Sequence, residues 1–202
     1  MNIGKKVVLE MSKVKCIGII AEDNSDFEAV KVLIARIIDR DNFSFKRRVG
    51  NGCGRVKQNA LKYAKNLNNR GCDMLILIHD LDKNNLAELL KKLQNKIKDA
   101  PFDKKFVCIP IEELEAWFLS DPVSIKTTFN LKRQPKFSGL PETVNSPKEV
   151  LADQISKCSD KQINFLPINN KIIAANVNLD LIKEKCPSFD LLHTFLLKYK
   201  YK

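Results

Sequence analysis

Short apolar runs of strand length alternate with segments of helical periodicity in the first part of the chain, and this alternation constrains the fold more than any other feature. The first run is Val14 to Ala21, and the next segment spaces Phe27, Val30 and Ile34 along one helical face. Alternating strands and helices favour a parallel sheet covered by helices on both faces, with right-handed crossovers. We therefore expect an α/β fold with a mostly parallel sheet.

The same unit recurs further along the chain. Phe43 to Val49 is predicted to be the second strand, and Arg55 to Leu67 the helix that follows it. Asp73 to His79 is continuously apolar, which is typical of a parallel strand buried on both faces, and Asn84 to Ile97 returns to helical periodicity. Lys105 to Ile111 is the fourth predicted strand.

Beyond Asp121 the pattern changes to helical segments separated by loops that contain proline. Ser146 precedes Pro147, and Glu149 follows three residues after Ser146, which predicts a helix start with Ser146 as its N-cap. We expect a helical C-terminal extension here.

These patterns divide the chain into three predicted parts. Residues 1–13 form an N-terminal extension, residues 14–121 the sheet domain, and residues 122–202 a helical C-terminal subdomain. Met11, Ser12 and Lys13 lie just before the first convincing strand, and Met11 is a candidate natural start that would make residues 1–10 an extension.

Charge and cysteine usage narrow the class of protein. The chain has 35 Lys and Arg against 24 Asp and Glu, a net charge of +11, which favours a polyanionic partner such as nucleic acid. The 6 cysteines show no Cys-x-x-Cys pair and are expected as buried thiols in a reducing compartment. No apolar run approaches the roughly 20 residues that span a membrane. We therefore expect a cytoplasmic protein without membrane contact.

Acidic residues follow three of the predicted strands. Because the carboxyl ends of parallel strands meet at one edge of a sheet, and ligands bind there, these acids are expected to converge. Glu22 and Asp26 follow the first strand; Asp80 and Asp82 follow the third; Glu112, Glu113 and Glu115 follow the fourth.

Converging carboxylates point to a divalent metal. Mg²⁺ prefers carboxylate oxygens and keeps several waters, so a few Asp and Glu side chains suffice. In an extended segment Asp80 and Asp82 would point to the same side and could share one ion. Phosphoryl-transfer sites often hold two such ions. The basic surface would then attract phosphates, and the acidic pocket would hold the ions that activate them.

Each acidic group also has a purely structural interpretation. The first could be a helix start capped by Asp23, Asn24 or Ser25. Asp80 and Asp82 could form a turn, with Asn84 as a helix cap. The three glutamates could be a solvated first helical turn. Their coincidence at three strand ends is what favours a site.

Two further features are weighed in the same way. His79 adjoins Asp80 but would face the opposite side of a strand, so packing is the expected role. The glycines of "VGNGCGRVKQ" resemble a phosphate-binding loop, but the sequence lacks Gly-Lys-Ser/Thr, and a structural turn is favoured.

Together these residues resemble a TOPRIM-type catalytic domain, the fold shared by topoisomerases, bacterial primases and the overcoming-lysogenization-defect (OLD) nucleases. The resemblance is closest to RloB-like and related prokaryotic TOPRIM-like proteins. In such proteins a first strand ends in Glu with an acid four positions later, here Glu22 and Asp26. A later strand ends in Asp-x-Asp, here Asp80 and Asp82, and a Glu lies two residues before Trp, here Glu115 in "ELEAWFLSD". The resemblance covers about residues 14 to 121. Many such proteins carry Glu-Gly where this chain has Glu-Asp after the first strand.

The resemblance implies a TOPRIM/Rossmann-like sheet and a metal-dependent nuclease acting on DNA or RNA. Glu22 would act as metal ligand or general acid/base, Asp80 and Asp82 as ligands of Mg²⁺ or Mn²⁺, Glu115 as a further acid of the catalytic site, and Asp26 as support for a second metal. It also implies prokaryotic anti-phage defence beside a separate ABC- or AAA-type ATPase, because this chain has no Walker motif.

Two other functions stay open. A non-catalytic TOPRIM-like subunit would bind nucleic acid or a partner without turnover. Nucleotidyl transfer of the primase or topoisomerase type is less favoured, because topoisomerases need a nucleophilic tyrosine and the tyrosines here lie in an inner helix or the tail. The sequence does not fix the oligomeric state.

Overall fold

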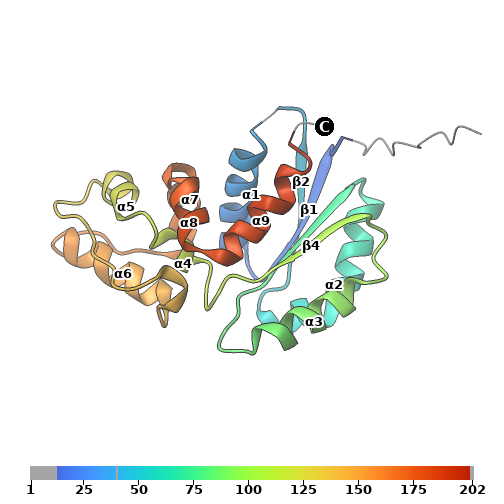
Figure 1. The fold of residues 1–202 in the computed structure, drawn as a ribbon, viewed down its shortest axis with the longest axis horizontal. Coiled ribbons are helices and arrows are strands. Elements are labelled where there is room, and N and C mark those ends of the chain that lie inside the picture. Colours follow the sequence, from blue (N-terminus) through green and yellow to red (C-terminus); the bar gives the residue numbers. More distant parts are fainter. Residues whose placement is uncertain (1–12, 40, 201–202) are drawn as a thin grey trace, which may run out of the picture.

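A computed structural model describes residues 13–39 and 41–200. The predicted N-terminal extension over residues 1–13 lies, except for Lys13, outside the described residues. The described residues form a four-stranded, all-parallel sheet in the order β2-β1-β3-β4 (Figure 1). The strands are β1 (Cys16–Ala21), β2 (Ser44–Val49), β3 (Met74–Ile78) and β4 (Lys104–Cys108). The predicted α/β fold with a parallel sheet is confirmed.

The two central strands are buried along their whole length. All residues of β1 and β3 are buried, whereas the residues of β2, on one edge, are half-buried or exposed. The register aligns Ile17 with Met74, and Met74 with Lys104, so the strands begin at a common level. Their carboxyl ends therefore also lie at one edge of the sheet.

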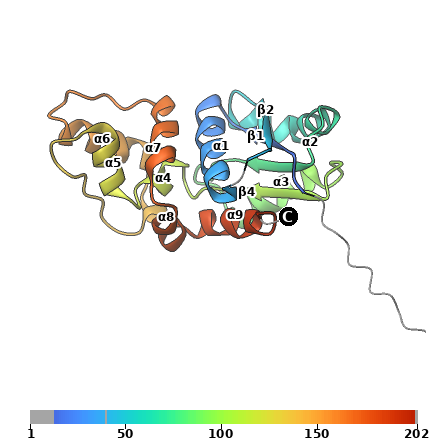
Figure 2. The ribbon, with the colours of Figure 1, turned by 90° about the horizontal axis from the view of Figure 1, so that it is seen from above.

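Helices cover both faces of the sheet (Figures 1 and 2). On one face α2 packs against β1, and α3 against β4; on the other face α1 packs against β1, and the last helix, α9, against β4. The bounds of these helices are α1 (Asn24–Ile38), α2 (Cys53–Asn69), α3 (Leu86–Ile97) and α9 (Pro187–Leu197). Since α1 and α2 lie on opposite faces, the connection from β1 leads one way along the sheet and the later connections lead the other way.

This reversal creates a crevice between β1 and β3. In open parallel sheets, ligands bind outside the carboxyl ends of the strands at such a topological switch point. Glu22 follows β1 directly, and Asp80 lies two residues after the end of β3. The fold thus places two of the predicted site residues on neighbouring strands at the switch point.

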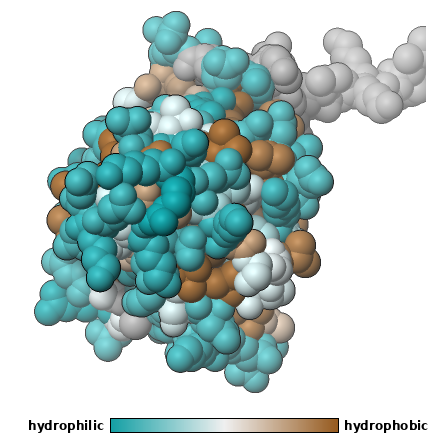
Figure 3. All heavy atoms as spheres, turned by 90° about the vertical axis from the view of Figure 1, so that its left-hand side faces the viewer, coloured by the Kyte–Doolittle hydropathy of each residue, from teal (hydrophilic) through white to brown (hydrophobic). Residues whose placement is uncertain are grey.

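The C-terminal helices form a layer that extends the α1 face of the sheet (Figure 2). α7 packs along α1, and α4 contacts α6 and α7, so that one apolar core runs from the sheet into this region. Figure 3 shows the end of the molecule formed by α5 and α6, whose surface is mostly hydrophilic. The bounds are α4 (Glu115–Phe118), α5 (Pro122–Phe129), α6 (Pro147–Cys158), α7 (Asn170–Asn176) and α8 (Leu179–Lys185), with the 3-10 turns η1 (Pro141–Thr143) and η2 (Pro167–Asn169).

Two predicted helix caps need correction in detail. Helix α6 starts at Pro147 with Ser146 at the N-cap position as expected, but Ser146 adopts a left-handed conformation with φ of 49° and makes no capping hydrogen bond with its side chain. Helix α3 is capped by Asn85, which accepts from the Glu88 backbone amide at 3.1 Å, and not by Asn84. Asn84 instead donates to the backbone carbonyl of Leu81 at 2.6 Å and closes the turn before the helix.

Among the described helices, none is both long enough and apolar enough to cross a membrane.

Candidate metal centre

Four carboxylates meet at the carboxyl edge of the sheet. They come from Glu22 after β1, Asp26 in the first turn of α1, Asp80 after β3 and Glu115 at the start of α4, and we call them the acid centre. Their proximity shows in their electrostatics: the charges of the other three members all raise the pKa of Asp80, in addition to the larger effect of its burial. The fold therefore brings together acids from three separate segments.

Glu22 is held by two donors from the end of β3. One of its oxygens, Oε1, accepts from the Asp80 backbone amide at 3.1 Å and lies 2.9 Å from Nδ1 of His79. The His79 ring is completely buried, as expected for a packing residue, but its contact with Glu22 was not anticipated. The other oxygen of Glu22 has no hydrogen bond to the described residues. One oxygen thus fixes the side chain, and the other remains for a ligand.

Asp80 is fixed in a similar way by the loop after β4. Its Oδ1 accepts from the Leu114 backbone amide at 3.1 Å, which ties the end of β3 to the start of α4. Its second oxygen receives no hydrogen bond from the part of the chain that is described. Burial, followed by the charge of Asp26, holds the pKa of Asp80 well above its usual range. The fold thus keeps this carboxyl group in place at a cost in charge repulsion.

The pKa of Asp26 is strongly perturbed as well. Burial is the main cause that raises its pKa to about 8, and the charges of Asp23, Glu115 and Glu22 add to the effect. Asp23 is the N-cap of α1, because its Oδ1 accepts from the Asp26 backbone amide at 3.0 Å. The structural interpretation of this segment as a capped helix start is therefore correct, but it does not exclude a site: Asp23 caps while Asp26 faces the other acids.

Glu115 is the most buried of the four, with 2% of its surface exposed. Burial raises its pKa, although Nδ2 of Asn170 donates to its Oε1 at 2.8 Å and favours the charged form. Asn170 begins α7, and it is itself completely buried. A side chain from the C-terminal region therefore positions the third acidic segment of the centre.

Lys148 is a cation whose pKa responds to the charges of these acids. Its Nζ lies 3.7 Å from Oε1 of Glu113, and its backbone amide donates to Oε2 of the same residue at 3.0 Å. Burial lowers the pKa of Lys148, but the charges of Glu115 and Glu113, followed by those of Asp80 and Asp26, raise it above its ordinary value. Lys148 therefore stays protonated beside the centre and offers a positive charge to an anionic ligand.

Asp82 does not lie where the extended-segment argument placed it. Strand β3 ends at Ile78, and Asp82 has a left-handed backbone with φ of 48° in an exposed turn. The expectation that Asp80 and Asp82 share one side of an extended segment is wrong, because the chain turns through left-handed backbone at residues 82 and 83. The charge of Asp82 still contributes to the raised pKa of Asp80, so it lies at the rim of the centre.

The other two glutamates of the third segment are also peripheral. Glu112 has φ of 58° and its carbonyl accepts from the Asp82 backbone amide at 3.2 Å, which joins the two loops. Glu113 pairs with Lys148 as described above.

The glycine-containing loop "VGNGCGRVKQ" lies beside Glu22: the Gly52 backbone amide donates to the Glu22 carbonyl at 3.2 Å, and Gly52 has φ of 119°, which requires glycine. This loop is therefore a structural turn, and its hydrogen bond holds the backbone of Glu22.

The donor set fits a hard divalent cation by its chemistry, since it is made only of carboxylates with free oxygens and mutual repulsion. A cation there would relieve the repulsion that raises the pKa values of Asp26 and Asp80. In the described residues, no three His, Cys, Asp or Glu side chains are arranged as a ready coordination shell. The acids have thus converged, and a shift of their free oxygens would be needed to complete a shell.

Three residues that contribute to the centre were not predicted from the sequence to belong to it. Lys148 and Asn170 reach the centre from helices that lie far along the chain, and neither belongs to a local motif. His79 adjoins Asp80 in the sequence. Because His79 lies just after the end of β3, the alternation of side chains along a strand did not predict the direction of its ring.

Comparisons with known proteins complete the description of the site. No curated protein and no solved structure matches the chain. A family model described as "Domain of unknown function (DUF4276)" matches residues 21–197, from the last residue of β1 to the last residue of α9. This match includes all four members of the acid centre together with Lys148 and Asn170. Because it spans most of the sequence, the chain belongs to the DUF4276 family.

Proposed function

We propose that the protein is a metal-dependent phosphodiesterase that cleaves DNA or RNA at the acid centre. The observation that carries the proposal is the convergence of Glu22, Asp26, Asp80 and Glu115 at the topological switch point, with the pKa values of Asp26 and Asp80 raised by burial and mutual repulsion. Perturbed carboxyl groups gathered in this way are typical of functional sites. The resemblance to TOPRIM-type proteins names these four residues and Asp82, and we propose that relationship as well.

Each residue has a role in this proposal. Glu22, Asp80 and Glu115 would hold Mg²⁺ or Mn²⁺, with Asp26 as support for a second ion. Asp82 would contribute from the rim. The chemistry that such a cation supplies is Lewis-acid polarisation of a phosphate ester.

Lys148 would bind a phosphate oxygen of the substrate. Its ammonium group lies beside the acids, is more than one-third exposed and stays charged because of its acidic neighbours. The net charge of +11 would attract a nucleic-acid backbone from further away. The negative charge of the acid centre would thus hold the cations, and the net positive charge of the protein would attract the substrate.

The partner and the cellular setting are also proposals. The resemblance favours a cytoplasmic defence protein that works beside a separate ATPase of the ABC or AAA type. Five cysteines are free thiols, which supports a reducing compartment: Cys16, Cys72, Cys108, Cys158 and Cys186.

A cleavage assay tests the proposal. Purified protein is incubated with plasmid, single-stranded DNA and tRNA, with Mn²⁺, with Mg²⁺ or with a chelator. We expect cleavage that needs the metal and that Asp80→Asn and Glu22→Gln abolish. Asparagine keeps an oxygen that can accept from the Leu114 amide, so this change removes charge with little effect on the loop.

Glu149→Gln is the matched control, because Glu149 is an exposed acid in the first turn of α6. It should leave cleavage unchanged. Cleavage that survives the combined Asp80→Ala and Asp82→Ala change would refute the assignment. Nucleic-acid binding without turnover in any metal would instead support the non-catalytic alternative.

A further inference from the structure

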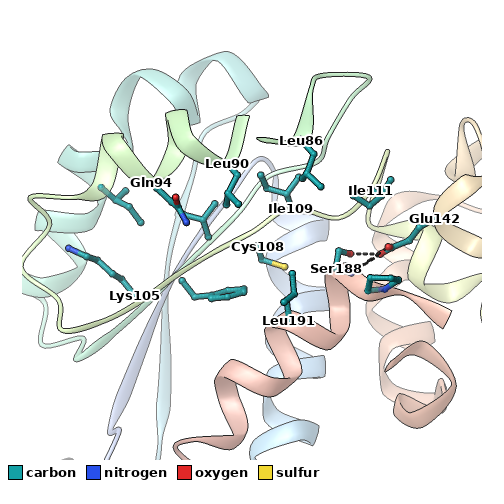
Figure 4. Close-up of a pocket in the computed structure, with 14 residues that line it drawn as sticks. Leu86, Leu90, Gln94, Lys105, Cys108, Ile109, Ile111, Glu142, Ser188 and Leu191 are labelled. Atoms are coloured by element: carbon teal, nitrogen blue, oxygen red, sulfur yellow. Dashed lines mark hydrogen bonds between the residues drawn. The ribbon is translucent and has the colours of Figure 1, made fainter. Parts of the chain in front are cut away.

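An apolar groove follows the free edge of the sheet, away from the acid centre. Its cavity measures about 440 Å³, with β4 and the loop after it as the floor, and α3 and α9 as the walls (Figure 4). None of the four members of the acid centre lines it. Exposed leucines stand on both walls: Leu86 on α3 is 44% exposed and Leu191 on α9 is 64% exposed.

The floor of this β4 groove carries backbone groups without strand partners. His79 donates to the Cys108 carbonyl at 3.1 Å, and Leu81 to the Pro110 carbonyl at 3.0 Å, so the even-numbered residues face β3. In a parallel strand, alternate residues direct their N–H and C=O groups to opposite sides. Val107 and Ile109 therefore direct theirs away from β3, and in the described part of the chain β4 has no other strand beside it. An open edge of this kind is a template for another strand.

The side chains of the groove suit an extended segment. The side chains of Val107 and Ile109 belong to the core under α3, and Phe106 and Cys108 to the core under α9, so apolar surface is presented on both sides of the edge. From Lys105 to Ile111 the floor is about 20 Å long, at about 3.3 Å for each residue of a strand. A segment of about six extended residues with aliphatic side chains on both of its faces would match this length.

The two ends of the groove carry opposite charges (Figure 4). At one end, Nζ of Lys105 donates to the carbonyls of Lys98 and Ala100, at 2.5 Å and 3.2 Å, and pairs with no carboxylate of the described residues. At the other end, Glu142 accepts from the hydroxyl and the backbone amide of Ser188. An incoming strand would therefore be acidic beside Lys105 and basic beside Glu142.

A second copy of the chain fits this groove poorly. The edge of β4 lies on a floor between two helices, and the same two helices would flank the edge of the second copy. The α3 and α9 helices of the two copies would meet at this edge and oppose the close approach of the two strands. A slender segment without flanking helices can reach the floor.

We propose that the β4 groove binds an extended segment of a partner protein, with aliphatic residues flanked by a basic and an acidic end, as an added strand of the sheet. This inference does not depend on the chemistry of the acid centre. Main-chain hydrogen bonds to Val107 and Ile109 would provide affinity, and the apolar walls would select the side chains.

Selection from a random peptide library on the full-length protein tests this proposal. We expect enriched peptides in which aliphatic residues run consecutively between a basic and an acidic residue. Leu191→Lys, on the wall of the groove, should weaken their binding by about tenfold or more. Ile168→Lys is the matched control, since Ile168 is 73% exposed and lies outside the groove, and it should leave binding unchanged.

A second measurement separates strand addition from other modes. Methylation of alternate backbone nitrogens in an enriched peptide should abolish binding in one of the two alternating patterns, because only one set of amides faces β4. Enriched peptides with helical spacing of apolar residues, binding that is unaffected by Leu191→Lys, or no enrichment at all would overturn the proposal. A dimer in solution that Leu191→Lys dissociates would also overturn it, since the edge would then belong to a second copy.

Discussion

Replacement of Asp26 by asparagine is expected to make the metal-free protein more stable, although it removes a member of the acid centre. The pKa of Asp26 rises from an ordinary 3.8 to about 8 in the folded state, mainly through burial. Folding therefore favours the protonated form, and the stability contribution of this group is present at low pH and is lost as the pH rises from 3.8 to 8. Asparagine has no charge to lose and avoids this cost.

The size of the effect follows from the same values. At pH 7 the unfolded carboxyl group is ionised, and the interval from 3.8 to 7 corresponds to about 4 kcal/mol at about 1.4 kcal/mol for each pH unit. The side chain of Asp26 is half-buried rather than sealed, and solvent screening reduces the expected gain to about 2 kcal/mol. Removal of this charge also lowers the pKa of Asp80, for which Asp26 is the largest charge effect.

Urea unfolding of both proteins between pH 5 and pH 8, in the presence of a chelator, measures this prediction. The free energy of unfolding of the wild-type protein should fall as the pH rises, and that of Asp26→Asn should fall less. The two should differ most at pH 8. A variant that is less stable than the wild type at pH 7 to 8, or an equal slope with pH, would show that Asp26 is not held in a repulsive, desolvated position.

The remaining predictions concern the metal and the supports of the site. Mn²⁺ at about 100 times its dissociation constant should stabilise the wild type by about 2.7 kcal/mol, and raise its Tm by about 5 to 10 °C in a thermal melt, whereas Asp80→Asn should show little gain. Asp121→Ala should cost about 1 to 2 kcal/mol in urea unfolding, because Asp121 caps α5 through the Ser124 amide at 3.0 Å and also accepts from the Asn178 amide at 2.9 Å. Ser146→Ala should cost almost nothing in the same assay, because that side chain makes no capping bond; equal costs would contradict the cap geometry. Trp117→Phe should cost about 1 to 3 kcal/mol, because it removes the donor to Oγ of Ser188 at 2.8 Å from a completely buried site; an unchanged free energy of unfolding would show that this hydrogen bond is dispensable.

The strands and their order of appearance were predictable because their signals are local. A run such as Met74–Ile78 has no polar residue that could face water, so a parallel strand buried on both faces was the natural interpretation. The position of Glu22 and Asp80 at one edge then followed from the geometry of parallel sheets. The sheet order, and with it the switch point between β1 and β3, did not follow, because it depends on which face each helix covers.

The parts of the site that escaped prediction depend on the tertiary structure. Lys148 and Asn170 approach the acids only because α6 and α7 fold back, and no spacing in the sequence relates them to Glu115. The prediction for Asp82 failed for a local reason. It assumed an extended backbone up to residue 82, whereas β3 ends at Ile78 and the chain turns through left-handed backbone at residues 82 and 83. Aspartate tolerates such a turn, so the sequence was compatible with both geometries.

The pairing of Glu115 and Trp117 in one short helix shows how the C-terminal region determines the acid centre. Residues two positions apart in a helix point in different directions, so Glu115 can face the acids while Trp117 faces the core. Asn170 holds Glu115, and Ser188 holds the indole of Trp117. Both partners lie beyond residue 121, where a boundary between two parts was predicted. The position of Glu115 therefore depends on contacts across that boundary. The acid centre is formed by the sheet together with the C-terminal helices, and not by the sheet alone.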